Sequence, residues 1–422
     1  MTSRIKLIEE AKKLLQENDM GGYTVPTHGL YPFQWNWDAA ITALGWMKVD
    51  EIRAWQEIEM LLKGQWENGM VPHIVFHKQV DSYFPGADVW GSNRELATTT
   101  ISQPPVLVSV VKIMLEQAKD KTLANNKLKE MLPSLIAYHQ WWYNDRDPEN
   151  TGLVVSYHPW ESGMDNSPAW DKSLAAVPPV TYQYKRKDLE HVDSDERPHA
   201  SEYDRYLFLV DFYKKSNFDS KVMYKECPYK MYDVGIISIL HKGTKDLISL
   251  CNSFGVEQQK IHWFEKEYQK TTFAIQRLWN EEHQSFLNTD AITNESFPVL
   301  TTGTMLALYG EFANREQAIS LRALMKDWLA DTGYGMSSTY AKCEAYEPQR
   351  YWRGPVWLHI NWLLALGTDH YGFDDESQQL KFSSEVLINE SGYFEYFNSE
   401  TGAGCGGGQF SWTAAIALHW FL

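Results

Sequence analysis

Apolar residues recur every three or four positions along most of the chain, and this spacing predicts a protein built of helices. In the first segment Ile5, Ile8, Ala11 and Leu14 form one stripe, and two glycines follow the expected end of the helix. The same spacing predicts helices over residues 39–47, 52–62, 106–118, 128–143, 201–214, 234–250, 263–279, 304–310, 318–329, 356–366 and 410–422. Strand signals are few, and the clearest covers residues 152–157. With about twelve helices and no Pro-, Ser- or Gly-rich linker, residues 1–422 are expected to form one all-α domain.

Two of these helices have recognisable start signals. Asp38 precedes the helix over 39–47, where it would serve either as an N-cap or as a ligand-binding carboxylate. Ser102 would cap the helix over 106–118, with the prolines at 104 and 105 in its first turn.

Connections rich in aromatic and acidic residues recur near positions 35, 103, 163, 233, 302 and 352. The intervals between them are about one helical hairpin long. In a barrel of helical hairpins, alternate connections emerge at the same end. We therefore expect these connections to converge on one cleft, where the site would lie.

The most unusual connection is His158-Pro-Trp-Glu-Ser-Gly-Met-Asp-Asn-Ser-Pro-Ala-Trp-Asp171, which holds three carboxylates and two indoles. A carboxyl group held against an indole in a cleft loses solvation, so it keeps its proton to higher pH and can act as a general acid. Flat indole faces also suit sugar rings. The stretch predicts a carbohydrate-processing cleft with Asp165 or Glu161 as its acid. The alternative is a tight acidic turn between two helices.

Composition narrows the class of partner. The net charge is −16, from 39 basic and 55 acidic residues, which argues against nucleic acid and against anionic membranes. The four cysteines are scattered and form no C-x-x-C pair, as expected for reduced thiols in a cytoplasmic protein without a zinc site. We expect neither a signal peptide nor a membrane span. A small-molecule substrate is therefore favoured, while the oligomeric state stays open.

Other stretches carry isolated polar groups, each of which could have either a structural or a functional role. In Phe394-Glu-Tyr-Phe397 a lone acid, Glu395, stands among three rings and would otherwise make a surface ion pair. His73 is either a structural histidine or a catalyst. The glycines of Cys405-Gly-Gly-Gly-Gln-Phe-Ser-Trp412 lack the lysine and the preceding strand of a phosphate loop. That segment is instead expected to be a flexible loop that allows close approach.

Taken together, the chain resembles glycoside hydrolase family 63, in the clan that also holds the trehalases, and especially its short bacterial mannosylglycerate and glucosylglycerate hydrolases. The resemblance rests on five motifs in family order: Gln34-Trp-Asn-Trp-Asp38, Glu161-Ser-Gly-Met-Asp165, Tyr351-Trp-Arg-Gly-Pro-Val-Trp357, Glu395-Tyr-Phe397 and Phe410-Ser-Trp412. It implies an (α/α)6 barrel, hydrolysis with inversion at the anomeric carbon, and no metal or other cofactor.

The resemblance also assigns roles. It makes Asp165 the general acid and Glu395 the general base, with carboxyl groups roughly 6.5–9.5 Å apart. Residues expected at the sugar subsite are Tyr31, Trp35, Trp37, Asp38, His73, Trp160 and Gly163. Residues expected in the rest of the pocket, including the aglycone contacts, are Tyr83, Gln103, Arg197, Tyr203, Tyr351, Trp352, Trp357 and Gln409. An anionic glycerate would need local donors in so acidic a protein.

The implied substrate is glucosylglycerate or mannosylglycerate, and the sequence does not choose between the two hexoses. Hydrolysis of another small α-glucoside, such as trehalose or kojibiose, is one alternative. A sugar isomerase or epimerase on the same barrel is another, with a proton-shuttling pair drawn from His73, His158 and His199. A non-catalytic sugar-binding barrel is a third. The segment 175–197 matches none of the motifs and is a candidate lid.

Overall fold

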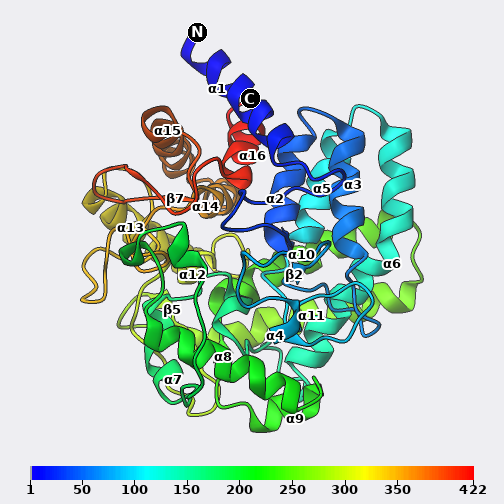
Figure 1. Ribbon diagram of the computed structural model, residues 1–422, viewed down its shortest axis with the longest axis vertical. Coiled ribbons are helices and arrows are strands. Elements are labelled where there is room, and N and C mark those ends of the chain that lie inside the picture. Colours follow the sequence, from blue (N-terminus) through cyan, green and yellow to red (C-terminus); the bar gives the residue numbers. More distant parts are fainter. Residues whose placement is uncertain (1) are drawn as a thin grey trace.

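Six helices form the inner wall of a barrel in the computed structural model, which describes residues 2–422 (Figure 1). Neighbours in this ring pack against each other, and Gly367 closes it by lying against the backbone of Leu308 and Tyr309. The inner helices are α2 (Asn36–Trp46), α5 (Leu107–Gln117), α10 (Val234–Ser253), α12 (Thr302–Met305), α14 (Leu358–His370) and α16 (Ser411–Trp420).

A second set of helices surrounds this ring. The outer helices are α1 (Thr2–Glu17) on α16, α3 (Glu51–Leu62) on α2, α6 (Lys121–Arg146) on α5, α11 (Gln258–Ala274) on α10, α15 (Asp374–Ser391) on α14, and α13 (Arg315–Asp331). Helices α1, α3, α6, α11 and α15 each pack mainly on one inner helix, whereas α13 and α12 both pack against strand β5. Six inner and six outer helices make an (α/α)6 barrel, and the two termini lie near each other (Figure 1).

The sequences of the two rings differ because their surroundings differ. All residues of α2 are buried, since this helix has neighbours on both sides. In α3 the residues Trp55, Ile58 and Leu61 are buried, whereas Ile52 is exposed, as expected for a helix with one packed face. The inner helices also approach closely: a Cβ on Gly45 of α2 would lie 2.6 Å from the Cα of Ala415 in α16.

The remaining elements are short and connect the rings. The extra helices are α4 (Ala87–Trp90), α7 (Asp171–Ala175), α8 (Ala200–Lys215), α9 (Ser220–Glu226) and the 3-10 turns η1 (Pro159–Ser162), η2 (Pro168–Trp170), η3 (Asp188–Glu190), η4 (Ser194–Glu196) and η5 (Ile275–Leu278). The antiparallel strand pairs are β1 (Gln34–Trp35) with β2 (Ile74–Val75), β3 (Met231–Tyr232) with β6 (Thr289–Asp290), β4 (Trp279–Asn280) with β5 (Ser285–Phe286), and β7 (Tyr396–Phe397) with β8 (Gly404–Cys405). No helix within residues 2–422 is both long and apolar enough to cross a membrane.

Several local predictions are wrong. The strand expected over 152–157 is irregular and makes one isolated bridge, from Ser156 to Met231. Asp38 is not an N-cap, because α2 begins at Asn36. Ser102 is not a cap either: its hydroxyl donates to the carbonyl of Val71, and α5 begins five residues later.

The set of helices that forms the barrel also differs from the predicted set. The helix predicted over 201–214 exists as α8, but it packs against α4 outside the double ring. Helix α15 was not predicted, because it presents few apolar residues. Its buried face includes Ser383 and Ser384, and Ser384 donates its hydroxyl hydrogen to the carbonyl of Leu380 within the same helix.

Candidate active site

The loops that precede several inner helices meet at one end of the barrel and enclose a cavity. Its walls come from the segments before and at the start of α2, before α5, before α14 and at the start of α16. The rest of the walls comes from residues 73–84, from η1 and the loop after it, from residues 188–198 with the start of α8, and from the residue before β7. The cavity, together with the open space at its entrance, encloses about 710 Å³ free of protein atoms.

Glu395 stands on one side of this cavity and is 2% exposed. Its Oε1 accepts a hydrogen bond from the hydroxyl of Tyr31 at 2.9 Å, and its Oε2 accepts one from the amide of Gly407 at 3.1 Å. Arg197 Nη1 lies 3.9 Å from Oε2. Burial raises the pKa of the Glu395 carboxyl, while Arg197 and these hydrogen bonds act in the opposite direction and favour the ionised form.

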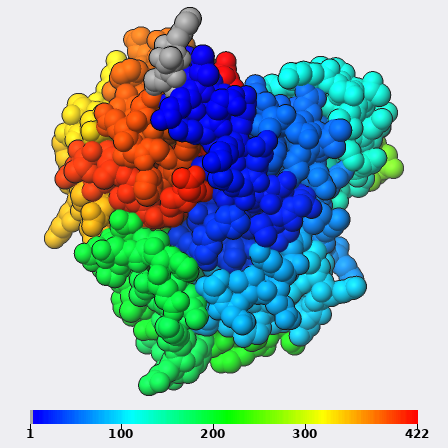
Figure 2. All heavy atoms as spheres, turned by 45° about the horizontal axis from the view of Figure 1, so that its top comes forward, coloured from blue at the N-terminus to red at the C-terminus, as the bar shows by residue number. Residues whose placement is uncertain are grey.

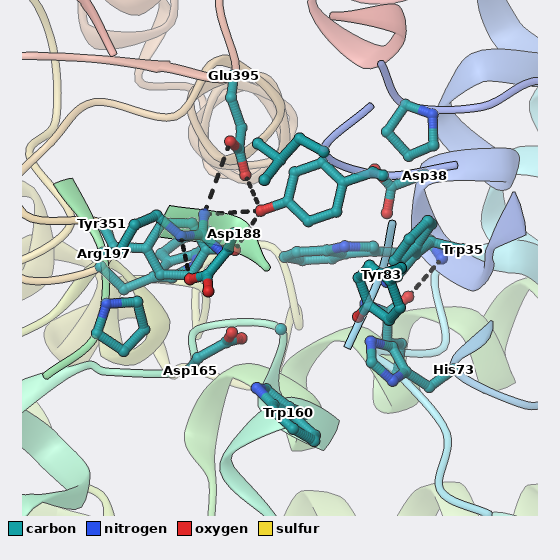
Figure 3. Close-up of a pocket in the computed structure, with 18 of the residues that line it drawn as sticks. Trp35, Asp38, His73, Tyr83, Trp160, Asp165, Asp188, Arg197, Tyr351 and Glu395 are labelled. Carbon is teal, nitrogen blue, oxygen red and sulfur yellow. Dashed lines mark hydrogen bonds and ion pairs between the residues drawn. The ribbon is translucent and has the colours of Figure 1, made fainter. Parts of the chain in front are cut away.

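Asp165 faces the same cavity from the opposite side (Figure 3). Its loop turns at Gly163, where φ is +67° and a Cβ would lie 2.7 Å from the indole of Trp37, so only glycine fits. The hydroxyl of Tyr206 donates to the backbone carbonyl of Asp165 at 2.9 Å. Burial raises the pKa of the Asp165 carboxyl to about 7, against the lowering effect of Arg197, and nearby Glu395 adds to the rise.

Glu161, the other acid that the sequence offered, lies outside the cavity and is fully buried. Arg146 Nη2 donates to its Oε1 at 2.5 Å, and the amide of Tyr157 donates to its Oε2 at 3.0 Å. Asp171 likewise pairs with Arg353 through two hydrogen bonds of 2.9 Å. Both carboxylates are engaged in ion pairs, so Asp165 is the acid of this stretch that a substrate can reach.

A chain of hydrogen-bonded phenolic and charged groups links Glu395 to Asp188, which also lines the cavity. Arg197 Nη1 donates to the hydroxyl of Tyr31 at 2.7 Å, and Arg197 Nε donates to Asp188 Oδ2 at 3.1 Å. Asp188 also accepts two hydrogen bonds from Arg186, at 3.0 and 2.5 Å. This arginine–aspartate cluster, defined here as Arg186, Asp188 and Arg197, holds two cations and one anion.

Aromatic residues shape the remaining walls. Tyr351 has a φ of +41°, unusual for a bulky residue, and its hydroxyl lies 3.2 Å from that of Tyr31. Behind it, the indoles of Trp352 and Trp357 stack at 3.8 Å. Asp38 is 7% exposed, and burial together with Glu395 raises the pKa of its carboxyl well above the usual range.

Fifteen of the seventeen residues predicted for the site line this one cavity. They are Tyr31, Trp35, Trp37, Asp38, His73, Tyr83, Gln103, Trp160, Gly163, Asp165, Arg197, Tyr203, Tyr351, Trp352 and Glu395. Trp357 lies behind the wall, and the side chain of Gln409 is exposed on the glycine-rich loop. Lining residues absent from the prediction are Pro26, Leu30, Phe84, Asp188, Pro198, Phe410 and Trp412. Phe410 and Trp412 belonged to a quoted motif, whereas Asp188 lay in the unmatched segment 175–197 and carried no signal.

The histidines do not form a proton-shuttling pair. Among residues 2–422, His73 is the one histidine that lines the cavity, and burial lowers its pKa to about 3, so it is neutral. His158 is fully buried, where its ring nitrogens contact the amide of Trp160 and the carbonyl of Tyr206. His199 stands before α8 and takes part in a capping box. This placement removes the basis of the isomerase alternative.

The chain is similar to several known glycoside hydrolases. The family model described as the mannosylglycerate hydrolase MGH1-like glycoside hydrolase domain matches residues 31–413. Mannosylglycerate hydrolase MGH1 of Selaginella moellendorffii is 43% identical, over 100% of this chain and 86% of its own. Glucosylglycerate hydrolase of Mycolicibacterium hassiacum is 31% identical, over 98% and 97%. The crystal structure of the family 63 mannosylglycerate hydrolase of Thermus thermophilus with Tris and D-glycerate superposes with a TM-score of 0.95 at 41% identity, covering 99% of this chain and all of that one.

Proposed function

Because the chain belongs to the MGH1-like glycoside hydrolase family, we propose that it hydrolyses an α-glycoside of glycerate to the free hexose and glycerate. Mannosylglycerate ranks first as substrate, since the relative named for it shares 43% identity, and glucosylglycerate ranks second, with 31%. The observation that carries the proposal is the pair of carboxyl groups, Asp165 and Glu395, on opposite sides of one cavity (Figure 3).

In the proposed reaction Asp165 gives its proton to the glycosidic oxygen as the bond from that oxygen to the anomeric carbon breaks. Glu395 takes a proton from a water molecule, whose oxygen forms the new bond to the anomeric carbon from the opposite face. This division of roles inverts the anomeric centre and calls for carboxyl groups roughly 6.5–9.5 Å apart. The pKa of about 7 for Asp165 supports its role as the acid.

The sugar is proposed to lie over Trp35, Trp37 and Trp160, with Asp38 and His73 as partners for its hydroxyl groups. Asp38 lines the cavity without being the cap of α2, so both of its oxygens can serve this purpose. Gln103 is partly engaged already, because its Oε1 accepts the amide hydrogen of Trp37 at 3.2 Å. These contacts fix the orientation of the ring between the two carboxyl groups.

The glycerate is proposed to lie at the end of the cavity away from the sugar, against Arg197. The residues around it would be Tyr83, Tyr203, Tyr351 and Trp352. A guanidinium group suits a carboxylate because it can donate two parallel hydrogen bonds. In the arginine–aspartate cluster two guanidinium groups share one carboxylate, Asp188, and Glu395 lies 3.9 Å from Arg197 Nη1. An aglycone with a carboxylate should therefore bind better than one of the same size without it.

A panel of five glycosides tests the proposal: mannosylglycerate, glucosylglycerate, glucosylglycerol, trehalose and kojibiose. We expect rapid release of hexose from the two glycerates and slow release from glucosylglycerol, which lacks the carboxylate. Proton NMR during the first turnovers should show the β-anomer of the hexose. An initial α-anomer would contradict inversion, and conversion between aldose and ketose without hydrolysis would contradict the proposed class of reaction.

A further inference from the structure

The glycine-rich loop around Gly406 and Gly407 folds directly against Glu395. The amide of Gly407 donates to Glu395 Oε2 at 3.1 Å, and the carbonyl of Gly407 accepts the amide hydrogen of Glu395 at 2.8 Å. Strand β8 leads into this loop and pairs with β7, which follows Glu395. The position of the carboxylate that is proposed as the base therefore depends on where this loop lies.

The loop leaves no room for a side chain at Gly406. Its φ is +69°, and a Cβ there would lie 2.4 Å from Glu395 Oε2 and 2.6 Å from the ring of Tyr396. The backbone thus reaches the carboxylate at van der Waals distance. A displacement of this loop would be transmitted to Glu395 without intervening atoms.

Glu196 holds the loop from the other side. Its Oε2 accepts the amide hydrogen of Gly406 at 2.7 Å, one residue before the amide that binds Glu395. Its backbone carbonyl accepts the hydroxyl hydrogen of Tyr396 at 2.5 Å. One residue of the segment 175–197 therefore contacts both chain segments that flank the proposed base.

The segment that carries Glu196 is itself fixed. Arg350 Nη1 donates to the carbonyls of Ser194 and Arg197, at 3.1 and 2.9 Å. In the space-filling view this part of the chain, in green, lies against the orange and red C-terminal part (Figure 2). Glu196 is thus held between an anchored turn and the glycine-rich loop, although it does not line the cavity.

We propose that Glu196 is a positioning residue for the base: its carboxylate holds the amide of Gly406 and so keeps Gly407 and Glu395 in the geometry that activates the water. The proposal rests on the proposed function. If Glu196 is shortened, the amide of Gly406 loses its acceptor, and the loop can move away from Glu395. A shift of about 1 Å at a reacting group can cost about 100-fold in rate.

The charge of Glu196 gives the proposal a second consequence. As a nearby anion it contributes to the raised pKa of Glu395. Replacing it with glutamine removes this charge but keeps an oxygen that can accept the hydrogen bond. The other titratable and charged groups around Glu395 remain in the variant, and Glu196 also raises the pKa of two of them, Tyr396 and Cys405. The full set is Tyr31, Asp38, Asp165, Arg197, Tyr351, Tyr396 and Cys405.

The test compares Glu196→Ala and Glu196→Gln with the control Glu190→Ala, measured on the better glycerate substrate. Glu190 belongs to the same segment, has the same charge and pairs with Lys185 and Lys187. We expect E196A to lower kcat about 10- to 100-fold with KM within about threefold. E196Q should keep kcat within about threefold and move the acidic limb of the kcat/KM profile to lower pH, because the base then ionises at lower pH.

A second pair of variants covers the case in which E196A does not fold. Gly406→Ala places a methyl group against Glu395, whereas Gly372→Ala imposes the same kind of backbone strain, with φ +72°, in open space. We expect G406A to lose at least about 100-fold in kcat and G372A to keep the wild-type value. Circular dichroism and thermal melting would show that both are folded.

Three results would overturn the proposal: E196A as active as E190A, E196Q and E196A impaired equally with an unmoved acidic limb, or G406A as active as G372A. Each of these presupposes a wild-type protein that hydrolyses a glycerate glycoside. If the wild type releases no hexose from any substrate of the panel, the proposed function fails instead. The two failures are therefore distinguishable in the same set of assays.

Discussion

Replacing Asp165 with asparagine removes the proposed acid with almost no change in shape. The amide fills the space of the carboxyl group, but it has no proton of suitable acidity to give to the glycosidic oxygen. The loop should stay in place, because its hydrogen bond from Tyr206 goes to the backbone carbonyl of residue 165. The turn at Gly163 is likewise independent of this side chain. Loss of activity would therefore report on chemistry and not on folding.

The size of the loss follows from the role. A positioned general acid contributes typically about 100- to 10,000-fold. The alkoxide of glycerate is a poor leaving group, so the loss should lie in the upper part of this range when the substrate is a glycerate glycoside. The pKa of about 7 means that the wild-type carboxyl is about half protonated at neutral pH, so the acid form is present under assay conditions.

An α-glycosyl fluoride as substrate distinguishes protonation of the leaving group from substrate binding and from activation of water. Fluoride leaves without being protonated, so D165N should hydrolyse the fluoride at a rate far closer to the wild-type value than the rate for the glycerate. The assay is release of hexose from both substrates at the same pH. An equal loss on the two substrates, or near-normal turnover of the glycerate, would refute Asp165 as the acid. Glu161→Gln, in the same stretch, weakens the buried ion pair with Arg146 and leaves Asp165 in place. It is the control that shows what disturbance of this stretch alone does to the two rates.

Three further predictions follow from the same geometry. Activity should fall as pH rises through about 7, since Asp165 then loses its proton; a kcat/KM profile without a basic limb near this pH would contradict it. Glu161→Ala should destabilise the protein by about 3–5 kcal/mol, because Arg146 is left buried without its partner; urea unfolding measures this, and an unchanged midpoint would contradict it. Asp188→Ala should raise KM about tenfold for glycerate glycosides, since Arg197 loses the partner of its Nε; an equal rise for trehalose would exclude a role at the carboxylate.

How far the sequence predicts the fold depends on how apolar each helix is. Helix α2 was predicted because a run of apolar residues marks a helix with neighbours on both sides. Helix α15 was not, because serines fill part of its buried face, and one of them, Ser384, donates its hydroxyl hydrogen within the same helix. This buried face therefore has the amino-acid composition of a solvent-exposed helix face. Only the neighbouring helix α14 shows that it is buried.

The site shows a similar limit. The residues of the acidic stretch do not by themselves show whether Glu161 or Asp165 is the acid, because the difference lies in a partner far from that stretch; the choice of Asp165 came from the family resemblance. Arg146, in α6, neutralises Glu161 and leaves Asp165 facing the cavity. Asp188 was missed for the same reason: its importance comes from Arg186 and Arg197, and a lone aspartate in a polar segment gives no signal.

The acidic character of the whole chain does not decide what the aglycone end of the cavity binds. At physiological ionic strength the field of a surface charge is screened within about 8 Å, so most of the acidic residues behind the net charge of −16 contribute little there. Arg197 is 6% exposed, and its neighbours are the buried phenols of Tyr31 and Tyr351 and the carboxylates of Asp188 and Glu395. Electrostatic interactions are stronger in such a buried place than in water. A polyanion would need a broad basic surface, whereas a single carboxylate needs one desolvated guanidinium. A protein of acidic composition can therefore still bind a single carboxylate, and removing the charge of Arg197 should abolish the proposed preference for glycerate over glycerol as the aglycone.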